Sequence, residues 1–192
     1  MSQSLPVRIA VVALSFGAAG LVTLVAKEDL VGTAMIPTKN DRWTVGFGST
    51  FRDDGSPVRP GDTITPPQAL KRTLAHIEKD EVGLKKCITG VLSKDEYDGL
   101  VEASYQYGVA AICKSTMVRE INAGNYVAAC MGYTEYKYLT TGNPTPGWTA
   151  FKFDASGRPI RWRFDCSTLG NKVCRGVWTR NLERQEKCLT SQ

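Results

Sequence analysis

Three residues near the N-terminus carry the side chains that hydrolysis of a glycosidic bond requires. Glu28 and Asp41 are acids, and Thr44 places a hydroxyl group shortly after them. In such a reaction one carboxyl group gives a proton to the leaving oxygen. A second carboxylate, helped by a hydroxyl, orients water or stabilises the positive charge that develops on the sugar. The chain has 19 acids in all, so residue type alone favours two ordinary surface acids.

The segment around these residues, EDLVGTAMIPTKNDRWTVGFGST, ends in a strand-like pattern. Residues 43–48 alternate apolar and small side chains, and the glycines within them permit turns or bulges. The stretch DDGSP at residues 53–57 is typical of a turn, and a second strand is expected after it. A short β-sheet is therefore predicted within residues 43–65.

Helical signals dominate the rest of the chain. Thr65 and Pro66 resemble an N-cap followed by a first-turn proline, which predicts a helix as far as about residue 86. Ser93 with Glu96 forms a capping-box pattern ahead of the next predicted helix. His76 lies beside the apolar stripe of the first of these helices, which favours a structural role for it. The remaining predicted helices cover residues 94–107, 115–122, 126–136 and 175–188.

Few strands and many helices predict an α+β fold in which a small sheet lobe and a helical lobe flank a cleft. A chain of 192 residues is long enough for one compact domain with its own core. Residues 140–147 are rich in Pro, Gly and Thr and are expected to form a loop, and no clear period follows as far as residue 170. A cleft of this kind would accept a long glycan chain.

The cysteines indicate an oxidising compartment. Six are present, and an even number favours disulfides, although six cysteines permit about 15 connectivities and the sequence does not choose among them. No C-x-x-C pair occurs and the single histidine is remote from any cysteine cluster, so neither a metal nor another cofactor is expected.

The positive charge is concentrated near the C-terminus. Between residues 158 and 188, six Arg and two Lys stand against three acids. A basic face of this kind would attract an anionic polymer, although a solvated helix face would have the same composition.

An apolar run precedes the candidate site. Residues 9–26 contain no charge and lie between Arg8 and Lys27. As a helix the run would extend about 27 Å, just short of the roughly 30 Å hydrocarbon core, so it could cross a bilayer only barely. A cleaved signal peptide, a permanent anchor and a segment that inserts and later leaves the membrane are the three interpretations. With Arg8 inside, the rest of the chain would lie outside the cytoplasm.

Four blocks of the sequence, in order, resemble the phage-type lysozymes of glycoside hydrolase family 24. The blocks LSKDEYDGLVEASYQYG, STMVREINAG and CRGVWTRNLERQEKC follow the N-terminal block, and the resemblance runs from residue 28 to residue 188. In the N-terminal block the resemblance rests on seven residues: Glu28, Ala34, Pro37, Asp41, Thr44, Gly46 and Gly48.

The resemblance implies a lysozyme-like fold with its acid at the end of a first, apolar helix. It implies an endolysin that hydrolyses the β-1,4 bonds between N-acetylmuramic acid and N-acetylglucosamine in peptidoglycan and so causes lysis of the host cell. Glu28 would be the general acid, Asp41 would stay ionised, and Thr44 would help Asp41 to position water. The spacing of Asp41 and Thr44 resembles a subgroup with a G-D-x-x-T pattern, with Asn40 in place of the glycine. Because this spacing departs from that of the best-known members, Asp53 and Asp54 are kept as substitutes for Asp41.

The resemblance also bears on the cysteines and the apolar run. Secreted relatives pair cysteines near the positions of Cys130 and Cys188, which would leave Cys166 with Cys174 and Cys87 with Cys113. The apolar run resembles the signal-arrest-release segment of certain endolysins. We therefore expect residues 1–27 to form this segment and residues 28–192 the catalytic domain. The protein would first lie in the host inner membrane, with its N-terminus in the cytoplasm, and then in the periplasm.

Other activities have to be weighed against this one. A lytic transglycosylase needs a single acid/base, because a hydroxyl of the sugar replaces water. A non-enzymatic wall-binding protein could use the basic C-terminal face with Trp148, Trp162 and Trp178, and a membrane-lytic protein would need only the N-terminal segment. The expected partners are peptidoglycan glycan strands and, transiently, the inner membrane through residues 9–26. The protein is expected to be a monomer, and no nucleic acid is expected as a partner, since G-F-G lacks the context of a phosphate loop.

Overall fold

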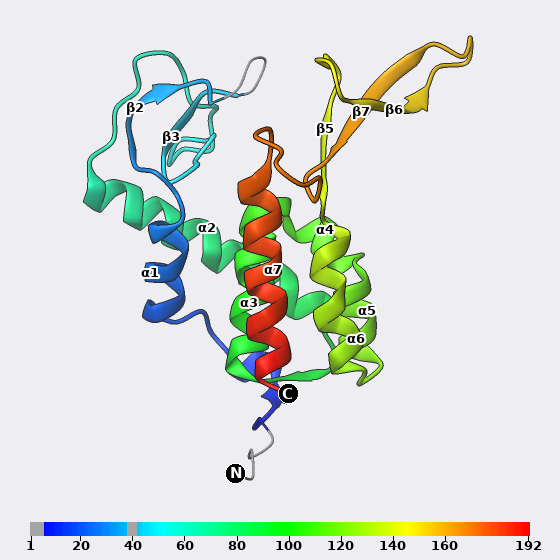
Figure 1. Ribbon diagram of the computed structural model, residues 1–192. Helices are drawn as coiled ribbons and strands as arrows, with labels where there is room; N and C mark the ends of the chain where they lie inside the picture. Colours follow the sequence, from blue (N-terminus) through cyan, green and yellow to red (C-terminus); the bar gives the residue numbers. More distant parts are fainter. Residues whose placement is uncertain (1–5, 38–41) are drawn as a thin grey trace. The chain divides into compact units, whose positions relative to one another are not determined.

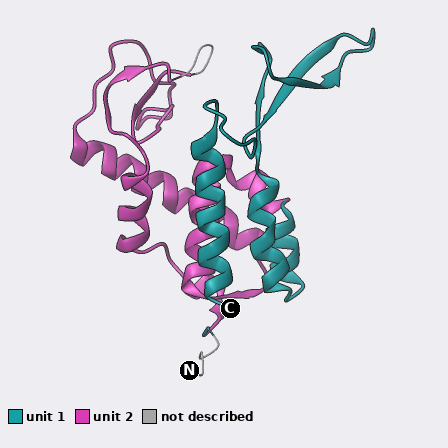
Figure 2. Ribbon diagram, viewed as in Figure 1, with its two compact units in different colours: residues 1–6, 115–192 teal, residues 7–114 magenta. Residues whose placement is uncertain are grey.

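The computed structural model describes residues 6–37 and 42–192, which divide into two compact units (Figures 1 and 2). We call Val7–Lys114 the N-terminal unit and Ser115–Gln192, to which Pro6 also belongs, the C-terminal unit. The first unit has short paired strands between its helices, whereas the second combines helices with one three-stranded sheet. The fold is α+β, as predicted.

The apolar run folds into several short elements instead of one helix. Strand β1 (Ile9–Ala10) pairs with β4 (Val91–Leu92), a 3₁₀ turn covers Val11–Ala13, and helix α1 covers only Ala18–Ala26. The expectation of one apolar helix over residues 9–26 was wrong on length, because the helix begins only after Gly17, whose extended backbone is not helical. None of the helices in the described residues combines the length and the apolarity that crossing a bilayer requires.

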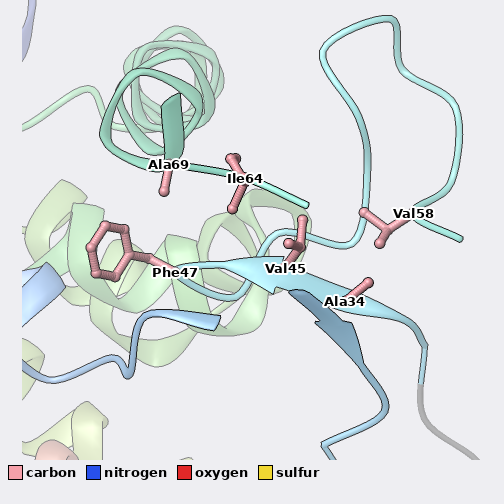
Figure 3. Close-up of a cluster of buried hydrophobic side chains, with 6 residues drawn as sticks. All are labelled: Ala34, Val45, Phe47, Val58, Ile64 and Ala69. Carbon is pink, nitrogen blue, oxygen red and sulfur yellow. The ribbon is translucent and has the colours of Figure 1, made fainter. Parts of the chain in front are cut away.

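A small sheet follows α1. Strand β2 (Val31–Met35) pairs antiparallel with β3 (Thr44–Gly46). The strand predicted within residues 43–48 is confirmed at Thr44–Gly46, whereas Phe47 and Gly48 lie in the turn after it. Its partner lies before it in the chain, and residues 57–65 contribute only isolated bridges. The core behind the sheet is apolar, and Figure 3 shows its side chains between the two strands and the start of α2. These buried residues are Ala34, Val45, Phe47, Val58, Ile64 and Ala69.

Three helices complete the N-terminal unit: α2 (Pro66–Cys87), α3 (Lys94–Tyr107) and α4 (Val109–Cys113). The capping box predicted for α3 is confirmed, since Glu96 Oε2 accepts a hydrogen bond from the Ser93 N–H at 2.8 Å. Helix α4 was not predicted. It packs closely on α2, because a Cβ at Gly83 would lie 2.7 Å from Val109 Cγ1.

In the C-terminal unit, helices α5 (Thr116–Asn122), α6 (Tyr126–Met131) and α7 (Arg175–Thr190) pack with a 3₁₀ turn, η2 (Gly132–Glu135). The helix predicted over residues 126–136 therefore ends early. Gly132 brings η2 against α5, since a Cβ there would lie 2.7 Å from Met117 Cγ. This close approach needs glycine.

The region between η2 and α7 contains a three-stranded antiparallel sheet that was not predicted, and the loop expected over residues 140–147 is confirmed at 142–148, between two of its strands. Strand β7 (Pro159–Asp165) lies between β5 (Tyr138–Thr141) and β6 (Thr149–Phe153). The sheet extends away from the helices of its own unit (Figure 2). None of its residues is buried, and the alternation of apolar and charged side chains along β7 was not recognised in the sequence.

All three cysteine pairings are confirmed. Cys87–Cys113 joins the ends of α2 and α4, and Cys130–Cys188 joins α6 to α7. Cys166–Cys174 closes a short loop between β7 and α7.

Candidate active site

Glu28 follows α1 directly. Its N–H donates to the carbonyl oxygen of Val25 at 3.3 Å, so the residue continues the last turn of the helix. Its side chain is half-buried. Next to it, Lys27 Nζ lies 3.8 Å from Oε2 of Glu102, a buried carboxylate on α3. These contacts hold Glu28 on ordered backbone, which a catalytic group requires.

Thr44 opens strand β3, opposite Met35 of β2. Its side chain is buried, and its Oγ1 donates to the carbonyl oxygen of Arg42 at 3.1 Å. The turn that follows is tight, because Val45 and Ser49 exchange two backbone hydrogen bonds of 2.9 and 3.0 Å. Gly46 permits this turn with its φ of +68°, and a Cβ there would lie 3.2 Å from Cβ of Ala69.

Tyr105, near the end of α3, connects these two parts of the N-terminal unit. Its hydroxyl donates a hydrogen bond to the carbonyl oxygen of Phe47, in the turn after β3. Burial raises the pKa of Tyr105, and the negative charges of Glu28 and Asp80 raise it further. The phenol is therefore a neutral donor within electrostatic reach of Glu28.

The sequence did not identify Tyr105 as a site residue, because it shares the apolar face of its helix and was assigned to the core. A signal was present nonetheless. A tyrosine on an apolar stripe must find a partner for its hydroxyl once it is buried.

Tyr105 also lies next to a group of polar side chains on α2 and α3. The His76 ring packs against the Tyr105 ring, with centroids 4.9 Å apart. His76 Nε2 lies 3.6 Å from Asp80 Oδ1, and Ser104 Oγ donates to Asp80 Oδ2 at 3.0 Å. Burial raises the pKa of Asp80, while His76 and Ser104 oppose the shift. The structure gives His76 the packing position that its sequence context predicts.

The substitutes for Asp41 are already engaged in other contacts. Asp53 accepts a hydrogen bond from Arg72 Nε at 2.6 Å, and this contact lowers the pKa of Asp53. Asp54 accepts the N–H of Ser56 at 2.8 Å, and its pKa is also lowered, by the Ser56 hydrogen bonds. Both carboxylates border a polar pocket of about 340 Å³. Its lining residues are Val45, Arg52, Asp53, Asp54, Asp62, Thr63 and Arg72.

Two of the three predicted site residues can be placed. Glu28 and Thr44 belong to the N-terminal unit, together with Tyr105, whereas Asp41 lies outside the described residues. Within residues 6–37 and 42–192, no three His, Cys, Asp or Glu side chains gather as a metal site would require.

A small antiparallel sheet, a set of packed helices and an acid directly after a short helix together define a lysozyme-like α+β fold. The sequence model of the family described as Phage lysozyme matches residues 27–150. The chain belongs to this family.

Individual relatives agree with the assignment. The endolysin of Salmonella phage P22 is 29% identical over 94 residues, which are 49% of this chain and 64% of the relative, so the match spans less than two thirds of that protein. The endolysin of Acyrthosiphon pisum secondary endosymbiont phage 1 is 28% identical over 106 residues, 55% of this chain and 69% of the relative. Among solved structures, an endolysin from Escherichia coli O157:H7 phage FAHEc1 superposes with a TM-score of 0.70 at 24% identity, covering 94% of this chain and 96% of its own. The structural likeness establishes the fold.

Proposed function

We propose that the protein is an endolysin that hydrolyses the β-1,4 bonds between N-acetylmuramic acid and N-acetylglucosamine in bacterial peptidoglycan, and so lyses the host cell. Membership of the phage lysozyme family supports this, and the matched residues include Glu28 and Thr44. The observation that carries the proposal is the position of Glu28. It follows a helix directly and lies within electrostatic reach of Tyr105, a half-buried tyrosine that is hydrogen-bonded to the turn after β3.

In this proposal Glu28 is the general acid that protonates the leaving glycosidic oxygen. Asp41 is the second carboxylate and activates water on the opposite face of the sugar, with Thr44 helping to orient that water. A separation of about 6.5–9.5 Å between the two carboxyl groups would leave room for the water and invert the anomeric centre. Asp53 and Asp54 are less suited to this role, because Asp53 already accepts a hydrogen bond from Arg72 of α2 and Asp54 accepts one from Ser56 in its own loop.

Zymography on purified peptidoglycan tests the assignment of Glu28. Glu28→Gln keeps the shape of the side chain and removes its proton, so we expect wall clearing to fall by at least about a hundredfold with an unchanged melting temperature. Asp29→Asn is the matched control, since it makes the same chemical change one residue further along, at an exposed position, and should clear the wall as the parent does. Full activity of Glu28→Gln would refute the proposal.

Mass spectrometry of the released glycans adds a second readout. A hydrolase yields reducing ends, because water attacks the anomeric carbon. Anhydro ends would instead identify a lytic transglycosylase, in which a sugar hydroxyl attacks.

We further propose that residues 9–26 associate transiently with the host inner membrane before the protein acts in the periplasm as a monomer. The absence of charge in this run supports membrane entry, and the burial of Val11, Leu14 and Leu24 supports a later folded state of the same residues. N-terminal sequencing of the periplasmic protein tests this. An intact N-terminus is expected, whereas a start near residue 27 would indicate cleavage and refute release.

A further inference from the structure

One face of the C-terminal sheet carries exposed cations. Side chains alternate between the faces of a strand, so Arg161 and Arg163 of β7 share one face, about 7 Å apart. Lys152 of β6 is the register partner of Arg161 and joins them on that face. All three side chains are exposed. We call Lys152, Arg161 and Arg163 the cationic triad.

The triad is electrostatically unfavourable by itself. Lys152 and Arg161 lie directly opposite each other, and like charges in this position destabilise a pair of strands. The acids of the sheet and its hairpin do not relieve this, because Asp165 pairs with Lys137 at 2.9 Å and Asp154 pairs with Arg158 at 3.1 Å. Among the described residues, no carboxylate forms an ion pair with the triad. An external anion would remove the repulsion.

Arg163 is oriented by two aromatic rings. Its guanidinium carbon lies 4.6 Å from the centre of the Tyr138 ring and 5.9 Å from that of Phe151. Cation–π contacts hold the guanidinium group but leave its N–H groups available at the edge. A guanidinium held in this way can bind a planar carboxylate through two parallel hydrogen bonds.

The opposite face of the sheet is apolar. Trp162 and Phe164 alternate with the arginines along β7, and Trp148 packs against Phe164 with ring centroids 5.8 Å apart. A bilayer surface would need cations and apolar groups on the same side to engage both. The triad face also carries the rings of Tyr138 and Phe151 beside Arg163, so a lipid surface is the competing partner, and the vesicle measurement below separates it from the wall.

We propose that the triad face binds the carboxylates of the peptide stems of peptidoglycan, and so holds the enzyme on intact wall. This rests on the proposed function, which makes peptidoglycan the substrate and brings a polymer with repeated carboxylates to the protein. Arg163 would bind one carboxylate in bidentate fashion, and Lys152 with Arg161 would share another. The stem carboxylates would then be a second feature of the substrate, besides the glycan, that the protein recognises.

Co-sedimentation on ice tests the proposal with the full chain. One substrate is intact sacculi. The other, called stripped glycan, is the same glycan after an amidase has removed its peptide stems and the lactyl carboxylates that this cleavage frees have been converted to neutral amides. The test variant is Lys152→Gln with Arg161→Gln. The matched control is Lys172→Gln with Arg175→Gln, which removes one Lys and one Arg from exposed positions elsewhere in the same unit.

We expect the test variant to bind intact sacculi about tenfold more weakly than the parent at low salt, and to bind stripped glycan as the parent does. The control should match the parent on both substrates. At about 1 M salt, where the screening length is about 3 Å, the difference on intact sacculi should vanish. Lys152→Arg with Arg161→Lys keeps the charges and should restore the binding.

Three results would overturn the proposal. The parent could bind stripped glycan as well as intact sacculi, the test variant could keep full binding to intact sacculi, or it could lose binding only to vesicles of phosphatidylglycerol. If the double variant melts at a lower temperature than the parent, the single variant Arg163→Gln provides an independent test of binding to intact sacculi. Sugar release by the parent is measured separately, so failure of wall hydrolysis and failure of carboxylate binding are distinguished.

Discussion

The hydroxyl of Tyr105 donates a hydrogen bond to the carbonyl oxygen of Phe47, which ties the end of α3 to the turn after β3. Phe47 is buried and Tyr105 lies within electrostatic reach of Glu28. One side chain thus links the helices, the hairpin and the proposed acid of the N-terminal unit. Tyr105 is a positioning residue in this arrangement.

Tyr105→Phe should therefore affect both stability and catalysis. The change leaves the buried carbonyl of Phe47 without its donor, which should cost about 1–3 kcal/mol of unfolding free energy. The turn that carries Thr44 and the surroundings of Glu28 should also loosen. We expect kcat to fall and KM to change little, measured on peptidoglycan well below the melting temperature.

Tyr97→Phe is the matched control for this variant. Tyr97 lies on the same helix and donates its hydroxyl proton to Glu81 Oε1 at 2.7 Å. Loss of the hydrogen bond from Tyr97 to Glu81 should lower stability to a similar degree without lowering kcat. Equal losses of kcat in the two variants would mean that Tyr105 acts only through stability.

Two substitutions at Thr44 should separate its hydroxyl from its methyl group. Thr44→Ser keeps the hydroxyl that donates to the Arg42 carbonyl and removes one buried carbon, which should cost about 1 kcal/mol. Thr44→Val keeps the shape and loses the hydrogen bond, again at about 1 kcal/mol. Only Thr44→Val should lower kcat, by about tenfold or more, if the hydroxyl orients water. Comparable kcat values for the two variants would exclude that role.

Local signals in the sequence predicted helices α2, α3, α5 and α7 well, because the causes of helix formation there are local. The capping box of Ser93 and Glu96 forms within one turn, and it begins α3 at the predicted residue. The pairing of β2 with β3 was missed, because the sequence from Val31 to Met35 contains no regular alternation and strand pairing depends on distant residues.

The residues of the candidate site also differ in whether the sequence could predict them. Glu28 and Thr44 were recognised by residue type and by resemblance, whereas the role of Tyr105 depends on a contact that spans 58 residues of sequence. The C-terminal sheet was missed although apolar and charged side chains alternate along β7, because the run is short and none of the residues of the sheet is buried. The role proposed for Asp41 stays a prediction.

The three disulfides should contribute unequally to stability. In the chain-entropy account, a longer closed loop restricts the unfolded chain more. Cys130–Cys188 closes 58 residues and should contribute about 4 kcal/mol, whereas Cys166–Cys174 closes 8 residues and should contribute about 2.5 kcal/mol. Urea unfolding of the paired Cys→Ala variants measures the difference. A larger loss for the 166–174 pair would show that the loop account fails here.

The pair of Arg52 and Asp62 should give the protein a specific loss of stability in acid. Two side-chain hydrogen bonds of 2.6 and 2.7 Å join them, and Asp62 also accepts the N–H of Arg59 at 2.9 Å. The Arg52 hydrogen bonds, with the Arg59 N–H, lower the pKa of Asp62 from 3.8 to about 2. A carboxyl whose folded-state pKa is lowered stabilises the fold fully above its unfolded pKa and loses this contribution as the pH falls through the folded value.

We therefore expect the melting-temperature difference between the parent and Asp62→Asn to be constant from about pH 5 to pH 8 and to shrink between about pH 4 and pH 2. Asp29→Asn removes one exposed negative charge elsewhere and is the control for net charge. Thermal unfolding followed by circular dichroism at each pH gives the comparison. A difference that stays the same at pH 2 would mean that Asp62 stabilises the loop by its shape and not by its charge.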